Sequence, residues 1–193
     1  GAAIFYALVN LAQNGDNIAF SNKIYGGTQT LIVHTLKRFG IEGRVFDIDD
    51  LSSLEKVIDS KTKAIFFESL SNPQISIPDI EVITRIAKKS GIVTICDNTV
   101  ATPILFRPFD FGIDISVHSL TKYINGHGSG LGGAIIEREG LNDLIKGNPR
   151  YEAFNTPDES YHGLVYASLP LPIFSIRIIT EWLRNIGATL SPQ

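Results

Sequence analysis

The sequence contains no methionine, a single cysteine and no long uninterrupted apolar segment. Methionine is missing even at position 1, where the chain opens directly in an apolar helical pattern. We therefore expect residues 1–193 to be an excerpt of a longer protein. Cys96 lies inside the apolar run IVTIC, which favours a small buried side chain over a nucleophile. A metal site is not expected, because one cysteine is too few for a typical zinc site and His118 and His127 lack a metal-ligand spacing.

The sequence also lacks a strong excess of charge of either sign. Charged residues make up 19% of the chain, the net charge is −3, and no basic run occurs. This balance argues against nucleic acid or an anionic membrane as a partner. Without a signal peptide or a membrane-spanning segment, the cytoplasm is the expected location. The 44% apolar content suits one globular unit, and a chain of this length buries roughly 70% of its unfolded surface.

Apolar runs that end in polar or glycine residues alternate with stretches of helical periodicity. Strands are expected at 17–20, 44–48, 63–67, 92–96, 113–117 and 133–136, and helices at 2–12, 29–38, from Asp50 or Ser52 to about 58, from Pro78 or Asp79 to 89, and at 173–185. This alternation predicts an α/β fold with a parallel sheet covered on both faces. The proline-bearing stretch 147–172 is expected to be an ordered excursion outside the sheet.

Polar clusters follow three of the expected strands. They are Glu68 to Asn72, Asp97 to Thr99, and Ser119 to Lys122, and Tyr25 follows an earlier strand by a short loop. In a parallel sheet, the carboxyl ends of the strands share one edge, where ligands bind. We therefore expect these clusters to form one site.

Lys122 is the centre of the chemical argument. It stands just beyond the 113–117 strand and before a glycine-rich loop. A lysine amine held in its neutral form can make an imine with an aldehyde cofactor such as pyridoxal phosphate. A fixed carboxylate keeps the ring nitrogen of that cofactor protonated, and Asp97 can supply it from a neighbouring strand end. The two side chains must then reach the same cavity.

The remaining requirements of pyridoxal phosphate also have candidates. Ser119 and Thr121 can donate hydrogen bonds to the phosphate, as can backbone N–H groups at the first helix around Gly1. Tyr25 can stack on the ring. Each residue also has a structural interpretation: Lys122 as a surface lysine, Asp97 as a cap after its strand, Ser119 and Thr121 as an exposed strand end, Tyr25 as a turn tyrosine, and Asn72 before Pro73 as a turn residue.

The glycines Gly128, Gly130 and Gly133 formally match the dinucleotide fingerprint. That fingerprint needs a strand before it and a helix after it. Here the glycines run into an expected strand, 133–136, so we interpret the match as accidental. The glycines are expected to let the backbone pass close to Lys122.

Several of these motifs together resemble the Cys/Met-metabolism family of pyridoxal-phosphate enzymes. The resemblance is carried by DNT at 97–99, ATP at 101–103, VHSLTKY at 117–123 and GHG at 126–128, with YGGT at 25–28 and ESLSNP at 68–73. It covers nearly the whole chain. It implies a type I, aspartate-aminotransferase-like large domain with a mostly parallel sheet flanked by helices.

The resemblance also implies roles for individual residues. Lys122 would be the Schiff-base lysine, Asp97 the partner of the pyridine nitrogen, and Tyr25 the residue stacked on the ring. Ser119 and Thr121 would hold the phosphate, with Thr99 and Gly1 in the same cofactor site. Asn72 and Tyr25 would face the substrate. The family's phosphate-binding helix usually opens with Ser-Gly, one further residue and then Ala-Ala, whereas here Gly1 is followed directly by Ala2 and Ala3.

Within the family, the stretch 148–163 is similar to O-acetylhomoserine sulfhydrylases. This similarity implies replacement of the acetate of O-acetylhomoserine by sulfide or a thiol, in an enzyme that assembles as a dimer of dimers. The alternatives are a cystathionine or methionine γ-lyase or a cystathionine γ-synthase with the same cofactor, an inactive fragment, and a non-catalytic nucleotide-binding α/β module, which would be colourless.

Overall fold

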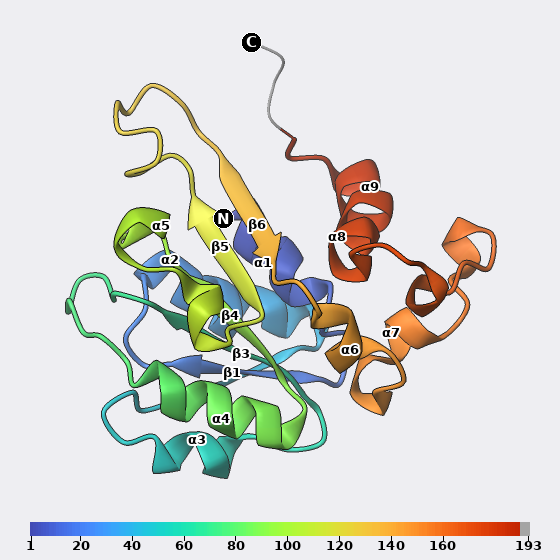
Figure 1. Cartoon of the computed structure of the whole chain (residues 1–193), viewed down its shortest axis with the longest axis horizontal. Helices are drawn as coiled ribbons and strands as arrows, with labels where there is room; N and C mark the ends of the chain where they lie inside the picture. The colour runs from blue at the N-terminus through green and yellow to red at the C-terminus, as the bar shows by residue number, and fades with distance from the viewer. Residues whose placement is uncertain (190–193) are drawn as a thin grey trace.

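A six-stranded β-sheet forms the centre of the computed structural model, which describes residues 1–189 (Figure 1). Its strands are β1 (Asn17–Ser21), β2 (Glu42–Phe46), β3 (Thr62–Glu68), β4 (Val93–Asp97), β5 (Ile115–Ser119) and β6 (Gly133–Glu137). They lie in the order β2-β1-β3-β4-β5-β6, with β6 antiparallel to β5 and the other neighbours parallel. The predicted α/β class with a mostly parallel sheet is confirmed.

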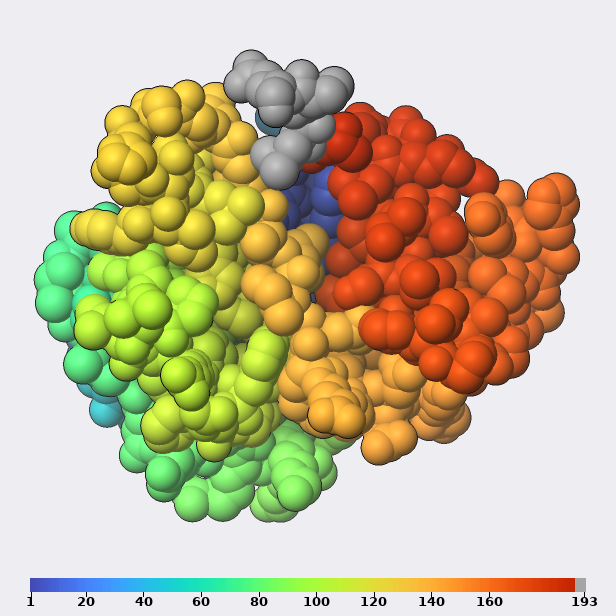
Figure 2. Space-filling view, turned by 45° about the horizontal axis from the view of Figure 1, so that its top comes forward, coloured from blue at the N-terminus to red at the C-terminus, as the bar shows by residue number. Residues whose placement is uncertain are grey.

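Helices cover both faces of this sheet. The face that carries Ala19, Ile65 and Phe67 packs against α3 (Ser52–Val57) and α4 (Ile80–Ser90). The opposite face packs against α1 (Ala2–Val9), against the helical run that begins with α2 (Gly26–Thr30), and against the C-terminal helices. The remaining helices are α5 (Thr102–Leu105), α6 (Leu141–Ile145), α7 (Glu152–Asn155), α8 (Ile173–Arg177) and α9 (Arg184–Ile186). Figure 2 shows α1 between the segment around β6 and the C-terminal helices.

α4 illustrates how the sequence determines these layers. The Asp79 carboxylate caps it by accepting the Val82 N–H at 3.1 Å, and Gly91 ends it in the left-handed conformation. Three isoleucines, Ile80, Ile83 and Ile86, recur at helical spacing and are buried. Burial of such a side chain stabilises the fold by about 1.5–3 kcal/mol. None of the helices within residues 1–189 is long and apolar enough to cross a lipid bilayer.

Three predicted elements have boundaries that were wrong by two or three residues. β2 ends at Phe46 instead of 48, because Ser53 and Asn22 side chains bond the backbone N–H groups that follow. β5 begins at Ile115 and extends to Ser119, where it pairs with Gly133 of β6. The second helix begins at 26, because the carbonyl of Tyr25 already accepts helical N–H groups.

The long helices expected from periodicity are also less regular than predicted. α1 ends at Val9 instead of 12, and the Asn10 side chain turns to bond the Phe174 carbonyl at 3.0 Å. The helix expected at 29–38 continues from α2 as a π-helical segment, Leu31–Thr35, and a 3₁₀ segment, Leu36–Phe39. The helix expected at 173–185 consists of α8, a π-helical segment and α9.

The stretch 147–172 lies outside the sheet, as predicted, and packs at the amino ends of β3 and β4. The buried Tyr151 hydroxyl donates to the Lys63 carbonyl at 2.9 Å and accepts the Val93 N–H at 2.7 Å. The Arg150 guanidinium bonds carbonyls around the start of β3, including that of Asp59 at 2.9 Å. This stretch therefore stabilises the amino ends of the strands. The polar clusters were expected at the opposite, carboxyl ends.

Candidate active site

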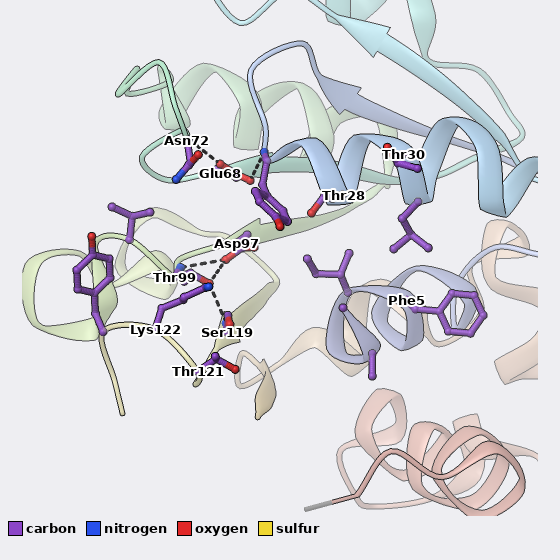
Figure 3. Close-up of a pocket in the computed structure, with 18 of the residues that line it drawn as sticks. Phe5, Thr28, Thr30, Glu68, Asn72, Asp97, Thr99, Ser119, Thr121 and Lys122 are labelled. Atoms are coloured by element: carbon purple, nitrogen blue, oxygen red, sulfur yellow. Dashed lines mark hydrogen bonds between the residues drawn. The ribbon is translucent and has the colours of Figure 1, made fainter. Parts of the chain in front are cut away.

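A cavity of about 1220 Å³ lies where the carboxyl ends of β3, β4 and β5 meet the starts of α1 and α2. Every residue predicted to belong to the site lines it: Gly1, Tyr25, Asn72, Asp97, Thr99, Ser119, Thr121 and Lys122. Figure 3 shows most of these side chains gathered at one end of the cavity, with Phe5 and Thr30 at the other. Residues 148–163, which suggested the subfamily, do not line it.

Lys122 and Asp97 reach this cavity from neighbouring strands. Asp97 is the last residue of β4, and Lys122 lies in the turn just after β5, where its N–H donates to the Ser119 carbonyl at 3.2 Å. Both line the cavity wall, as the proposed chemistry requires. Their position at one cavity follows from topology, because β4 and β5 are parallel neighbours whose carboxyl ends lie side by side.

Thr99 holds Asp97 and Ser119 in place. Oδ1 of Asp97 accepts the Thr99 N–H at 3.0 Å and also the Thr99 hydroxyl. The same hydroxyl oxygen accepts the Ser119 N–H at 2.8 Å. Burial raises the pKa of the Asp97 carboxyl, and the hydrogen bonds from Thr99 oppose that rise. Thr99 therefore links the β4 and β5 loops and leaves Oδ2 of Asp97 available to a ligand.

The two hydroxyls predicted to hold a phosphate differ in their surroundings. Within residues 1–189, the Ser119 hydroxyl takes part in no hydrogen bond. The Thr121 hydroxyl accepts the Gly132 N–H at 3.1 Å and donates to the Gly132 carbonyl at 3.3 Å. Thr121 thus closes the glycine-rich loop, a role that the sequence did not indicate. To bind a phosphate it would redirect its hydrogen and could keep the bond from the Gly132 N–H.

The glycines of this loop allow unusual backbone conformations and close packing. Gly126 and Gly128 adopt positive φ angles of 72° and 66°, which glycine tolerates best. Gly133 starts β6, so the segment lacks the helix of a dinucleotide fingerprint. A β-carbon on Gly133 would stand 2.8 Å from that of Ala3. The close approach that requires Gly133 is therefore with α1. The loop backbone also passes close to Lys122, as expected, because the Gly126 N–H donates to the Lys122 carbonyl at 2.8 Å.

Tyr25 lies on the N-cap of α2 with 58% of its surface exposed. Its ring lies directly over Gly27, where an added β-carbon would stand 2.6 Å from Cε1 of the ring. Gly27 thus provides the space that lets the ring occupy its place at the cavity. The sequence motif YGGT indicated the tyrosine but did not assign a role to this glycine.

Glu68 is the cavity residue that sequence analysis did not include in the site. It ends β3, is 4% exposed, and is paired in register with Asp97. Oε1 accepts the Tyr25 N–H at 2.7 Å and Oε2 accepts the Asn72 N–H at 3.0 Å. Burial, with a smaller contribution from the nearby Asp97 charge, raises the pKa of Glu68 to about 7. The signal available in the sequence was its position at the head of the polar run after β3.

His118 and Cys96 are buried next to the site but do not line the cavity. His118 bonds Ser116 at 2.9 Å through Nε2, and burial lowers its pKa. Burial likewise raises the pKa of the Cys96 thiol, which fits the predicted role as a small buried side chain. Within residues 1–189, no three His, Cys, Asp or Glu side chains are grouped closely enough to hold a metal ion.

Solved and curated proteins resemble this chain throughout. An O-acetyl-L-homoserine sulfhydrylase of Corynebacterium glutamicum is 42% identical over 193 residues, which are 98% of this chain and 44% of that protein. A crystal structure from Campylobacter jejuni, assigned as an O-acetylhomoserine (thiol)-lyase and containing N'-pyridoxyl-lysine-5'-monophosphate, is 71% identical with a TM-score of 0.99; the match covers 100% of this chain and 47% of that one. An O-acetylhomoserine sulfhydrylase of Wolinella succinogenes is 32% identical with a TM-score of 0.84, covering 99% of this chain and 50% of that one.

This chain therefore spans about half the length of the proteins that it matches. The family model described as "Cys/Met metabolism PLP-dependent enzyme" matches residues 1–193 in full. The fold, with its mostly parallel sheet, agrees with that of the solved relatives. The chain belongs to the Cys/Met metabolism family of pyridoxal-phosphate-dependent enzymes.

Proposed function

We propose that this chain forms the cofactor-binding part of an enzyme that acts on O-acetylhomoserine. The enzyme replaces the acetate with sulfide or a thiol and so produces homocysteine or methionine. The observation that carries the proposal is the placement of the Lys122 amine and the Asp97 carboxylate at one cavity. The printed names of the relatives support the choice of substrate within the family.

The groups around the cavity fit pyridoxal phosphate. Lys122 supplies the amine for the aldehyde, and Oδ2 of Asp97 is available to the ring nitrogen. Ser119, with Thr121 and the backbone around Gly1, can donate hydrogen bonds to the phosphate, and Tyr25 offers a flat surface for the ring. Thr99 serves this site indirectly, through Asp97 and Ser119.

When bound, pyridoxal phosphate supplies a ring that absorbs negative charge from the substrate carbon next to the amine. The chain's own residues do the rest. Nζ of Lys122, once released by the substrate amine, removes and returns protons at the α and β carbons. General acid–base work of this kind contributes about 10²–10⁴-fold to a rate. The Asp97 carboxylate keeps the ring nitrogen protonated, and we expect the exposed Asn72 amide to contact the substrate carboxylate.

Two parts of the proposal concern the whole protein. We infer that the whole protein acts in the cytoplasm on small molecules, and that it assembles as a dimer of dimers. We further infer that residues 148–163 influence assembly or stability instead of substrate choice. The support is their position at the amino ends of β3 and β4, away from the cavity.

The proposal is tested by the visible spectrum and by three parallel assays of the full-length protein. We expect a visible band that borohydride removes, and homocysteine formation from O-acetylhomoserine plus sulfide. Release of products from methionine or cystathionine alone would instead indicate a γ-lyase, and formation of cystathionine and acetate from O-acetylhomoserine plus cysteine would indicate a γ-synthase. A colourless protein that binds a nucleotide would contradict the cofactor assignment itself.

A substitution at Gly27 tests the role of Tyr25. Gly27→Ala places a methyl group 2.6 Å from the present position of the Tyr25 ring, so the ring must move. Stacked aromatic pairs are worth about 0.5–1.5 kcal/mol, and we therefore expect the Kd for pyridoxal phosphate to rise about 2- to 10-fold. Titration of the apoprotein followed by visible absorbance measures this change.

Gly26→Ala is the matched control for this prediction. It lies in the same turn of α2, but a β-carbon there meets nothing within 4 Å. Alanine is up to about 1 kcal/mol more favourable than glycine in a helix, so neither variant should lower the melting temperature. Equal Kd values for the two variants would show that the position of the Tyr25 ring does not matter.

A further inference from the structure

Glu68 is a buried carboxylate without a cationic partner. It is 4% exposed, and none of the ion pairs among residues 1–189 includes it. Its register partner on the neighbouring strand is another carboxylate, Asp97. An arrangement of this kind opposes folding unless hydrogen bonds to the carboxylate compensate for it. The reason for keeping a glutamate here must therefore lie in what its two oxygens bind.

Those oxygens join the backbones of two separate loops. Oε1 accepts the N–H of Tyr25, at the N-cap of α2, and Oε2 accepts the N–H of Asn72, in the loop after β3 (Figure 3). Tyr25 and Asn72 are the two residues proposed to contact the ring and the substrate. One carboxylate thus fixes the positions of both main chains against the end of β3.

We propose that Glu68 is a positioning residue that holds Tyr25 and Asn72 at their working distance from Asp97. This inference rests on the proposed function, since it assigns Glu68 a task in that same site. Glu68 acts through the two backbones, and its carboxylate oxygens are occupied by them. It is distinct from Thr99, which performs the corresponding task for Asp97 and Ser119 on the other side of the cavity.

The two hydrogen bonds that Glu68 accepts explain why a carboxylate is required at this position. Both partners are N–H donors, so both oxygens must be acceptors. A glutamine of the same size has only one acceptor oxygen and would turn an NH₂ group toward the second N–H. An aspartate has both acceptors but is shorter by one methylene. Glu68→Gln therefore tests the number of acceptor oxygens, and Glu68→Asp tests the length of the side chain.

The ionisation of Glu68 supports this interpretation. Its pKa is raised to about 7 by burial and by Asp97. Below that pH a proton occupies one oxygen, which becomes a weaker acceptor for the N–H that it faces, so one of the two loops is held less tightly. Asp97, Lys122 and the phenols of Tyr6, Tyr25 and Tyr123 are the other titratable side chains around the cavity. The Cys96 thiol on β4 and the His118 imidazole on β5 lie buried next to it, and both are present in the wild type and in the variant.

The test compares the wild-type holoenzyme with Glu68→Gln at pH 8. We expect the variant to raise the Kd for pyridoxal phosphate and the KM for O-acetylhomoserine by about 10-fold or more, the effect of leaving one buried N–H without an acceptor. We expect the KM of the wild type to rise as the pH falls through about 7 and that of Glu68→Gln to stay constant. The wild type and Glu68→Gln use the same cofactor and the same sulfur donor. Protonation of either ligand therefore cannot produce a difference between the pH profiles of the two enzymes.

Asp114→Asn is the matched control. Asp114 is also a buried carboxylate that accepts a backbone N–H, from Thr94 at 2.8 Å, although it also pairs with the Arg138 guanidinium at 2.8 Å. It lies at the amino end of β5, away from the cavity. The Asp114→Asn variant should have a lower melting temperature than the wild type and the same Kd for pyridoxal phosphate and KM for O-acetylhomoserine. If Glu68→Gln does not fold, Glu68→Asp should keep the pH step but weaken binding.

Three results would overturn the inference. The first is a Glu68→Gln enzyme with wild-type Kd, KM and pH profile. The second is an Asp114→Asn enzyme with the same binding losses, which would mean that any buried carboxylate matters equally. The third is a Glu68→Asp enzyme that binds as the wild type does. A wild-type protein without a cofactor band or sulfhydrylase activity would instead contradict the proposed function.

Discussion

Replacement of Lys122 by alanine should abolish the visible band of covalently held pyridoxal phosphate and lower turnover of O-acetylhomoserine by about 10⁴-fold or more. The size follows from losing both the attachment point of the cofactor and the group that moves protons at the substrate carbons. The measurement combines the visible spectrum with the steady-state rate of homocysteine formation.

Folding should be unaffected by this substitution. The Lys122 side chain is exposed and makes no hydrogen bond within residues 1–189, so its removal leaves no buried group unpaired. Lys122→Arg is the matched control for charge, because it keeps a cation in the same turn but lacks an amine that can be neutral at pH 7. An alanine or arginine variant with normal turnover would eliminate the proposed mechanism.

Asp97→Asn should lower kcat by about 10²–10³-fold while the cofactor remains attached to Lys122. The substitution conserves shape, and its amide oxygen can still accept the hydrogen bonds from Thr99. What is lost is the negative charge that keeps the ring nitrogen protonated. Loss of one fixed electrostatic partner in an active site has effects of this order. Rates at saturating O-acetylhomoserine, together with the visible spectrum, measure it.

The comparison again uses Asp114→Asn, because Asp114 is a buried carboxylate at the opposite end of the sheet. We expect that variant to lose stability and to keep its kcat. If Asp97→Asn retained wild-type kcat, the carboxylate would be only a cap after β4, the structural interpretation considered for it above.

Much of this arrangement could be predicted from the sequence because strand ends are marked by a change from apolar to polar residues. Asp97, Ser119 and Lys122 all follow β-branched runs, and parallel strands bring such positions to one edge. The α/β class was predictable for the same reason. Boundaries were less predictable, because side chains such as Ser53 and Asn22 bond the backbone after β2 and end that strand early.

Contacts between distant segments could not be predicted in this way. Nothing in the run ESLSNP indicates that Glu68 reaches the Tyr25 N–H on a different loop. Likewise, the bond between Thr121 and Gly132 depends on how the glycine-rich loop folds back after β5. Polar side chains have several possible partners, and the choice among them is made by tertiary packing.

The position of Tyr151 has an evolutionary consequence. Its hydroxyl joins β3 to β4 at their amino ends, and Arg150 adds further bonds there. The sheet is thus held together by residues that do not touch the cavity. Descendants of this protein could exchange substrate-facing residues one at a time without first acquiring compensating mutations in the interior.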